Sequence, residues 1–295
     1  MAEYHYGGQA VMEGVMIRGQ KTVTTAVRLG NGEITVNNKP LSPLFTGRIR
    51  KIPFLRGIIV LIESLVLGIG SLLYSANVVL EEETDTKISG GTTWLILTLS
   101  IAFGVGLFFL VPLGIAGLLN PLIESAVVFN LVEGGVRLLM FVIYLWLIAF
   151  MPDVRRVFAY HGAEHKTINA FEAGVPLEAA EVDRFSTAHT RCGTAFLLAV
   201  LVIAILVFSL VGKQAAWIMV SSRIVLLPVI AALGYEATQY GSRHIKNPLV
   251  KAAMMPGLWL QKLTTRQPDE KQIGVAIAAL KGALAIDKGE EPAPV

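Results

Sequence analysis

Residues 93–119 read TWLILTLSIAFGVGLFFLVPLGIAGLL, an apolar run without one acidic or basic side chain. A helix of about 20 such residues crosses the hydrocarbon core of a bilayer. Of the 295 residues in the whole chain, 54% are hydrophobic and 16% are charged. Soluble domains carry about 25% charged residues. A chain this apolar cannot cover a water-facing surface, so the sequence predicts an integral membrane protein.

The same composition argues against other classes of protein. The one cysteine, Cys192, cannot close an intrachain disulfide, so nothing indicates an oxidising compartment. The net charge of +3 is too small to imply a nucleic-acid partner. No apolar leader precedes residue 50, so we expect no signal peptide. The partner that the sequence implies is the lipid bilayer, and a homo-oligomer is compatible with it.

Four segments approach the length needed to cross a bilayer. The predicted spans are residues 93–119, about 136–151, 194–211 and about 217–235. The second is short and borrows residues from Pro121 onward, and the fourth contains Arg223. A fifth apolar stretch, residues 57–80, includes Glu63 and several other polar side chains.

The placement of lysine and arginine predicts the orientation. Residues 1–56 hold eight of them, residues 152–193 hold five and residues 236–295 hold eight, whereas residues 120–135 hold none. With four spans, the three basic regions lie on one side, and the positive-inside rule makes that side cytoplasmic. If residues 57–80 also crossed, eight positive charges would lie outside. We therefore expect that stretch to be interfacial or re-entrant, with its glutamate facing protein or water.

These assignments predict four regions along the chain. They are a cytoplasmic β-rich region at 1–56, an interfacial or re-entrant helix with a linker at 57–92, a four-helix membrane domain at 93–235 with a cytoplasmic helix and loop at 152–193, and a cytoplasmic helical tail at 236–295. The fold class is therefore mainly α: a multi-pass protein of the bacterial cell membrane with about four transmembrane helices and both termini cytoplasmic.

Two local patterns refine the ends of the chain. Residues 22–28 and 33–37 are rich in β-branched side chains and flank Gly30-Asn31-Gly32, so they predict a small β-hairpin. Residues 268–270 read Pro-Asp-Glu, which is typical of a helix start, and they precede an amphipathic pattern at 273–286.

The segment with the clearest chemistry is a predicted helix at residues 152–174, where His161 and His165 fall within the apolar stripe. Imidazoles four residues apart on a helix lie about 5–6 Å from each other, so both can bind one zinc ion. The intervening Glu164 completes an H-x-x-E-H pattern, in which the glutamate polarises a metal-bound water. The alternative is that both histidines are hydrogen-bonded structural groups. Glu172 is too far along the helix to join the same ligand set.

A second cluster is predicted at the start of the third span, where Cys192 lies near a helix N-terminus and beside Arg191. Both features favour the thiolate. Cys192 is therefore a candidate metal ligand, with His189 three residues earlier, or a catalytic nucleophile activated by histidine. A small buried structural cysteine is the third alternative.

A third cluster follows the fourth span, where Glu236 either completes the metal site or pairs with Arg243. The predicted topology brings all three clusters to the cytoplasmic face, together with the N-terminal stretch from Gly7 to Glu13. The Gly7-Gly8 pair predicts a tight turn in preference to a phosphate loop.

Several of these segments resemble an uncharacterised bacterial membrane-protein family, domain of unknown function 1385 (YqhQ-like). The matching segments read GGQAVMEGVM at 7–16, YHGAEHK at 160–166, RCGT at 191–194 and TTR at 264–266, followed by Pro268 and Asp269. The resemblance runs from about residue 5 to 285, and it implies a multi-spanning membrane protein loosely labelled as a metal-dependent enzyme. The family has a proline after its equivalent of His189 and an acid at position 267. This chain has Thr190 and Gln267, and neither change removes a candidate ligand.

Two hypotheses of function follow. In the first, the protein is a membrane-embedded, metal-dependent hydrolase with a site facing the cytoplasm. Zn²⁺, or another divalent metal, is bound by His161 and His165 with His189, Cys192 or Glu236, while Glu164 is the general base. Its substrate is a lipid head group, a membrane-delivered peptide or a small polar metabolite.

In the second hypothesis, the protein is a non-catalytic channel, transporter subunit or assembly factor, and its polar cluster is structural or lines a pore. Arg137, Arg223 and Glu63, which lie within apolar segments, favour this second class.

Overall fold

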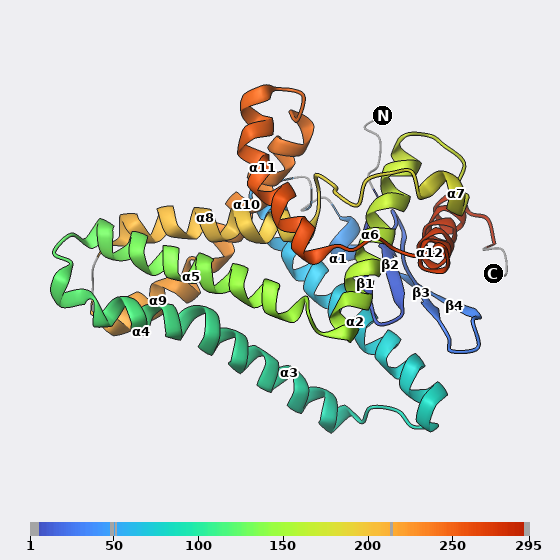
Figure 1. Cartoon of the computed structure of the whole chain (residues 1–295), viewed down its shortest axis with the longest axis horizontal. Coiled ribbons are helices and arrows are strands. Elements are labelled where there is room, and N and C mark those ends of the chain that lie inside the picture. The colour runs from blue at the N-terminus through green and yellow to red at the C-terminus, as the bar shows by residue number, and fades with distance from the viewer. Residues whose placement is uncertain (1–5, 48–49, 51, 213–214, 292–295) are drawn as a thin grey trace.

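The computed structural model describes residues 6–47, 50, 52–212 and 215–291. It contains an antiparallel sheet covered by helices at one end of an elongated molecule, and a group of long apolar helices at the other (Figure 1). The fold is mainly helical, with a small N-terminal sheet, as the sequence predicts.

The sheet is a four-stranded antiparallel meander in the order β1-β2-β3-β4. The strands are β1 (Gly7–Val11), β2 (Gly14–Arg18), β3 (Thr22–Arg28) and β4 (Ile34–Pro40). The predicted hairpin is confirmed as β3 and β4, with Arg28 opposite Ile34. The turn predicted at Gly7-Gly8 is wrong, because these residues begin β1 and Gly8 lies opposite Ile17 of β2.

Two helices far apart in sequence, α6 (Pro152–Glu172) and α12 (Glu270–Lys288), pack with one face of the sheet. Their common core includes Ile17 of β2, Tyr160 and Ile168 of α6, and Ile273 and Leu280 of α12. Asp269 caps the start of α12, and its side chain accepts from Gln272 N in a capping box. This confirms the helix predicted at 273–286. The helix is buried on more of its surface than the predicted amphipathic pattern implies, so it belongs to the core.

The other face of the sheet lies against α2 (Leu55–Thr84). Leu67 of α2 packs against a buried cluster that includes Val11 and Met16 of the first two strands. Thr25 Oγ1 donates to Ser71 Oγ at 3.1 Å. Because α2 is one continuous 30-residue helix, it does not turn back as a re-entrant segment would.

The remaining long helices are apolar. They are a segment built from α3 (Gly90–Val105), the π-helical turn η2 (Gly106–Leu110) and α4 (Val111–Leu118), then α5 (Ala126–Ile148) and α8 (Gly193–Val211). These three and α2 are the four helices among the described residues that are long and apolar enough to cross a membrane. The predicted span at 136–151 therefore begins ten residues earlier, at Ala126.

The predicted span at 217–235 is not one straight helix. It is divided at Leu226 into α9 (Ala216–Val225) and α10 (Leu227–Arg243), which meet at 45° and reach the length of a span only as a pair. Pro228 explains the break, because it has no N–H to donate and its ring clashes with the preceding turn. Helix α11 (Pro248–Thr264) and three short elements, α1 (Pro43–Thr46), η3 (Asn120–Leu122) and α7 (Ala179–Val182), complete the described chain.

The exposure of α3 and α4 supports a membrane environment. In the described residues 90–118, none of the most apolar 18-residue window is buried, and Trp94 is 71% exposed. A helix that is apolar on every side has no stable water-facing surface, so lipid or another protein must cover it.

Glu63 of α2 joins three parts of the fold. Its carboxylate is 3% exposed; it accepts from Arg18 of β2 at 2.9 Å and also pairs with Arg50, which precedes α2. Glu63 thus faces protein, one of the two surroundings expected from sequence.

We predict that Glu63→Gln lowers the thermal unfolding midpoint, because the substitution leaves two guanidinium groups facing an uncharged amide. The free energy of unfolding should fall by about 2–3 kcal/mol. Glu83→Gln, at an exposed position of the same helix, is the matched control and should leave the midpoint unchanged. Equal midpoints for the Glu63 variant and the wild type in detergent would show that this pairing does not hold the sheet to α2.

Candidate metal centre

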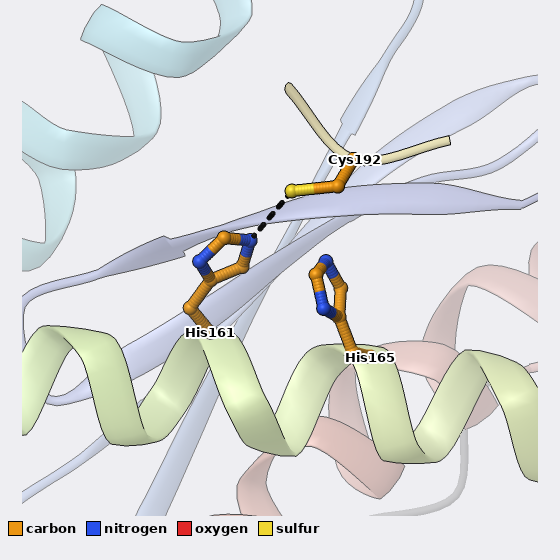
Figure 2. A group of neighbouring side chains, drawn as sticks. All are labelled: His161, His165 and Cys192. Carbon is orange, nitrogen blue, oxygen red and sulfur yellow. Dashed lines mark hydrogen bonds between the residues drawn. The ribbon is translucent and has the colours of Figure 1, made fainter. Parts of the chain in front are cut away.

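Three side chains with metal-binding atoms converge where α6 meets the start of α8. His161 and His165 lie one turn apart on α6, and Cys192 is the residue that precedes α8 (Figure 2). One ring nitrogen of each histidine and the Cys192 sulfur lie within 4.8 Å of one another. The histidine pair predicted from the H-x-x-E-H pattern and the cysteine predicted from a separate segment are therefore neighbours.

Main-chain carbonyls orient both imidazole rings. His161 Nδ1 lies 2.8 Å from the Thr264 oxygen, and His165 Nδ1 lies 2.6 Å from the Thr187 oxygen. Since a carbonyl only accepts, each Nδ1 carries the hydrogen, and in the neutral ring Nε2 keeps its lone pair. Hydrogen bonds of this kind are typical of metal-binding histidines. Both lone pairs are thus available to a cation.

Gly162 allows the segment that carries the Thr264 carbonyl to pass close to α6. A Cβ atom at position 162 would lie 2.1 Å from the Arg266 oxygen, and Arg266 N donates to Phe158 O at 2.9 Å. The segment after α11 therefore passes directly over α6. Its contribution was not predicted, although the TTR motif at 264–266 was already singled out by the resemblance.

Cys192 occupies the predicted position at a helix N-terminus. Its sulfur accepts from Thr194 N at 3.4 Å and lies 3.3 Å from His161 Nε2. The side chain is buried. The sulfur thus lies at the N-terminal end of α8 and beside an imidazole nitrogen.

Glu164 lies beside the same group of atoms. One carboxylate oxygen is 3.9 Å from His165 Nε2, and the other accepts from Gly8 N at 3.1 Å. A Cβ atom on Gly8 would lie 2.2 Å from the Met16 oxygen and 3.3 Å from Glu164 Cγ. The glycine in β1 thus lets a buried carboxylate approach the strand, a role that the sequence pattern did not reveal.

His189 borders the three-residue group without belonging to it. Its ring centre is 5.6 Å from that of His165, and its Nε2 is 3.6 Å from a Glu172 oxygen. Gln261 holds the backbone of His189 through both its N–H and its carbonyl. His189 is therefore placed to support His165.

Glu172 lies between His189 and Arg191, and it forms an ion pair with Arg191. Burial alone would raise the pKa of Glu172, but its contacts with His189 and Arg191 outweigh that effect, so the pKa lies below its ordinary value. Glu172 thus stays outside the group of metal-binding atoms, as its spacing predicts.

Glu236 does not join the group. Its carboxylate pairs with Arg56 and accepts from Phe54 N at 3.2 Å. Of the two alternatives for Glu236, a metal ligand or an ion-pair partner of an arginine, the structure shows an ion pair, with Arg56 in place of Arg243. Sequence reasoning missed this pair because the two residues are 180 positions apart.

Comparisons with known proteins identify the family of this chain but assign no activity to it. The family described as "Protein of unknown function (DUF1385)" matches residues 52–286. The "Uncharacterized protein YqhQ" of Bacillus subtilis (strain 168) is 35% identical over 297 residues, which cover 96% of this chain and 93% of that protein. No solved structure matches the chain.

The lowered pKa of Glu172 predicts a pH-dependent contribution to stability. A carboxylate with a depressed pKa stabilises the fold at pH values above its unfolded pKa of about 4.3, and the contribution is lost as the pH falls through the lower folded value. Glu172→Gln should therefore lower the unfolding midpoint at pH 7, and this effect should shrink as the pH falls below about 4.3 and vanish only below the folded pKa. Thermal unfolding across this range measures the difference, with Glu178→Gln, at an exposed site, as the control. A difference that is independent of pH would contradict the assignment.

Proposed function

The chain belongs to the family of proteins of unknown function DUF1385, and from this premise we propose that it is a membrane-embedded hydrolase that depends on one zinc ion. His161, His165 and Cys192 are the protein ligands in this proposal. The observation that carries it is the convergence of two ring nitrogens and one sulfur within 4.8 Å of one another.

The donor set suits zinc. Imidazole nitrogen and thiolate sulfur are preferred zinc ligands, and catalytic zinc sites commonly use three protein ligands and leave a fourth position for water. The buried position of Cys192 and His165 keeps competing water away from the bonds. A zinc ion there would supply a Lewis acid and lower the pKa of a water molecule.

Glu164 is the general base in this proposal. One of its oxygens lies 3.9 Å from His165 Nε2, next to the atoms that would hold the ion. The hydrogen bond from Gly8 N holds the other oxygen, so the carboxylate is already oriented to accept a proton. His189 lies beside the His165 ring and itself contacts Glu172, so it would help to position His165.

Cys192 is better assigned as a ligand than as a nucleophile. A cysteine nucleophile needs one histidine as its base, and His161 at 3.3 Å could serve. That assignment leaves the second oriented ring, His165, without a role. A shared cation uses all three groups.

The packing supports a topology in which the chain crosses the membrane an even number of times between the sheet and α6, and again an even number of times between α6 and α12. The sheet, α6 and α12 share one core, so they lie on one side of a membrane. Three apolar helical segments separate the sheet from α6, and one of them therefore does not cross. We assign this role to α2, because it lies along the sheet. The α3–α4 segment and α5 then form one crossing pair, and α8 with the α9–α10 pair forms another. The positive-inside rule makes the side of the sheet cytoplasmic.

A second candidate function, a transporter or channel, is favoured by one observation. Arg137, Glu133 and Arg223 form a buried charged cluster within the apolar helices. Buried charges in such helices are often functional, and a hydrolase site at the cytoplasmic end does not require them.

We predict about one zinc ion per chain in protein purified in mild detergent and analysed for metals. The double variant His161→Ala and His165→Ala should lose the metal, because only one ligand remains. Glu164→Gln should keep the zinc and lose hydrolysis. His244→Ala, at an exposed site outside the cluster, is the control. Wild-type protein without stoichiometric metal, or an unchanged content in the double variant, would overturn the proposal.

The topology predicts which added cysteines a membrane-impermeant maleimide can reach in intact bacterial cells. Glu124→Cys, in the connection before α5, should react from outside. Lys87→Cys, between α2 and α3, and Glu178→Cys, after α6, should react only after permeabilisation. The wild type, whose Cys192 is buried, is the control. Labelling of Lys87→Cys in intact cells would mean that α2 crosses the membrane.

A further inference from the structure

A second polar cluster lies on helices that contribute nothing to the candidate metal centre. It consists of Glu133 and Arg137 of α5 and Arg223 of α9. Each guanidinium binds a different oxygen of the same carboxylate: Arg137 pairs with Oε1, and Arg223 Nη2 donates to Oε2 at 3.0 Å. The three side chains are at most 4% exposed.

The cluster carries one positive charge in excess. Two guanidinium groups face one carboxylate, and neither arginine pairs with any other acid among the described residues. Burying an ion that is not balanced costs several kcal/mol. The charge therefore needs a counter-ion or strong dipoles around it.

The neighbouring groups compensate only part of this cost. Phe208 lies with its ring centre 4.8 Å from Arg223 Cζ and 5.8 Å from Arg137 Cζ, so its ring face attracts both cations weakly. Carbonyl oxygens of Phe108 and Met219 accept one hydrogen bond each. These dipoles carry no net charge.

One donor in the cluster has no acceptor. Arg223 Nε is buried and makes no hydrogen bond within the described part of the chain. Arg223 as a whole is only 3% exposed. A buried donor of a charged group that lacks an acceptor destabilises the fold. Arg223 also lies in the last turn of α9, next to the break at Leu226. Broken helices within membrane proteins frequently surround bound ions.

We propose that a small monovalent anion, chloride, binds beside Arg223 Nε and neutralises this cluster. One negative charge neutralises the net charge of +1 that two guanidinium groups and one carboxylate carry. The ion must be small, because protein atoms leave Arg223 only 3% exposed. A lipid phosphate does not reach an arginine that protein atoms cover. The site is independent of the zinc proposal, since the two share no residue.

Thermal unfolding of the purified full-length protein in detergent tests the site. Chloride replaces gluconate at constant ionic strength, and the midpoint should rise by about 3 °C or more and then saturate. Arg223→Gln should lose this dependence, because the remaining Arg137–Glu133 pair is neutral. Arg243→Gln, an exposed arginine on α10, should keep it.

Equilibrium binding of radioactive chloride to the wild type provides a second readout that needs no variant. Saturable binding of about one chloride per chain, displaced by bromide, supports the site. A midpoint that does not respond to chloride, an unchanged response in Arg223→Gln, or stabilisation by phosphate instead of chloride would each overturn the proposal.

Discussion

Two main-chain hydrogen bonds determine what the candidate centre can do. The carbonyls of Thr187 and Thr264 each accept from the Nδ1 of one imidazole, and so they fix which nitrogen of each ring carries the lone pair. Without these bonds, histidines one turn apart would rotate independently. With them, His161 Nε2 faces the Cys192 sulfur, and His165 is held next to it. The chemistry of α6 thus depends on two segments that lie elsewhere in the sequence.

Further contacts hold those two segments in place. Lys166, itself 3% exposed, donates to the backbone and side chain of Asp183 at the start of the loop that supplies Thr187. Gln261 holds the backbone of His189 near the end of the same loop. Gly162 lets the segment after α11 cross α6. The site is therefore built from three segments, and its geometry requires the packing of the whole sheet unit.

The sequence predicted features whose cause is local. The Asn-Gly turn marks the hairpin of β3 and β4, Asp269 marks the start of α12, and the spacing of His161 and His165 places both rings on one side of α6. Cys192 at a helix start follows from the apolar run after it.

Features that depend on distant partners escaped prediction. Strand β1 reads GGQAV and has little intrinsic preference for a strand, so its pairing with β2 decides its conformation. The salt bridge of Glu236 with Arg56 and the contact of Gly8 with Glu164 both join residues more than 150 positions apart. The bend at Leu226 was indicated by Pro228, but the apolar composition around it favoured one continuous span. The loop before Cys192 carries no periodicity that would locate Thr187 beside a histidine.

The central claim is that one cation is held by two imidazoles and one sulfur. X-ray absorption at the zinc edge of the purified protein measures those ligands directly. We predict one sulfur at about 2.3 Å and nitrogen or oxygen neighbours at about 2.0–2.1 Å, with the sulfur absent in Cys192→Ser. A zinc spectrum with nitrogen and oxygen neighbours alone in the wild type, or no zinc edge in fully folded protein, would contradict the account.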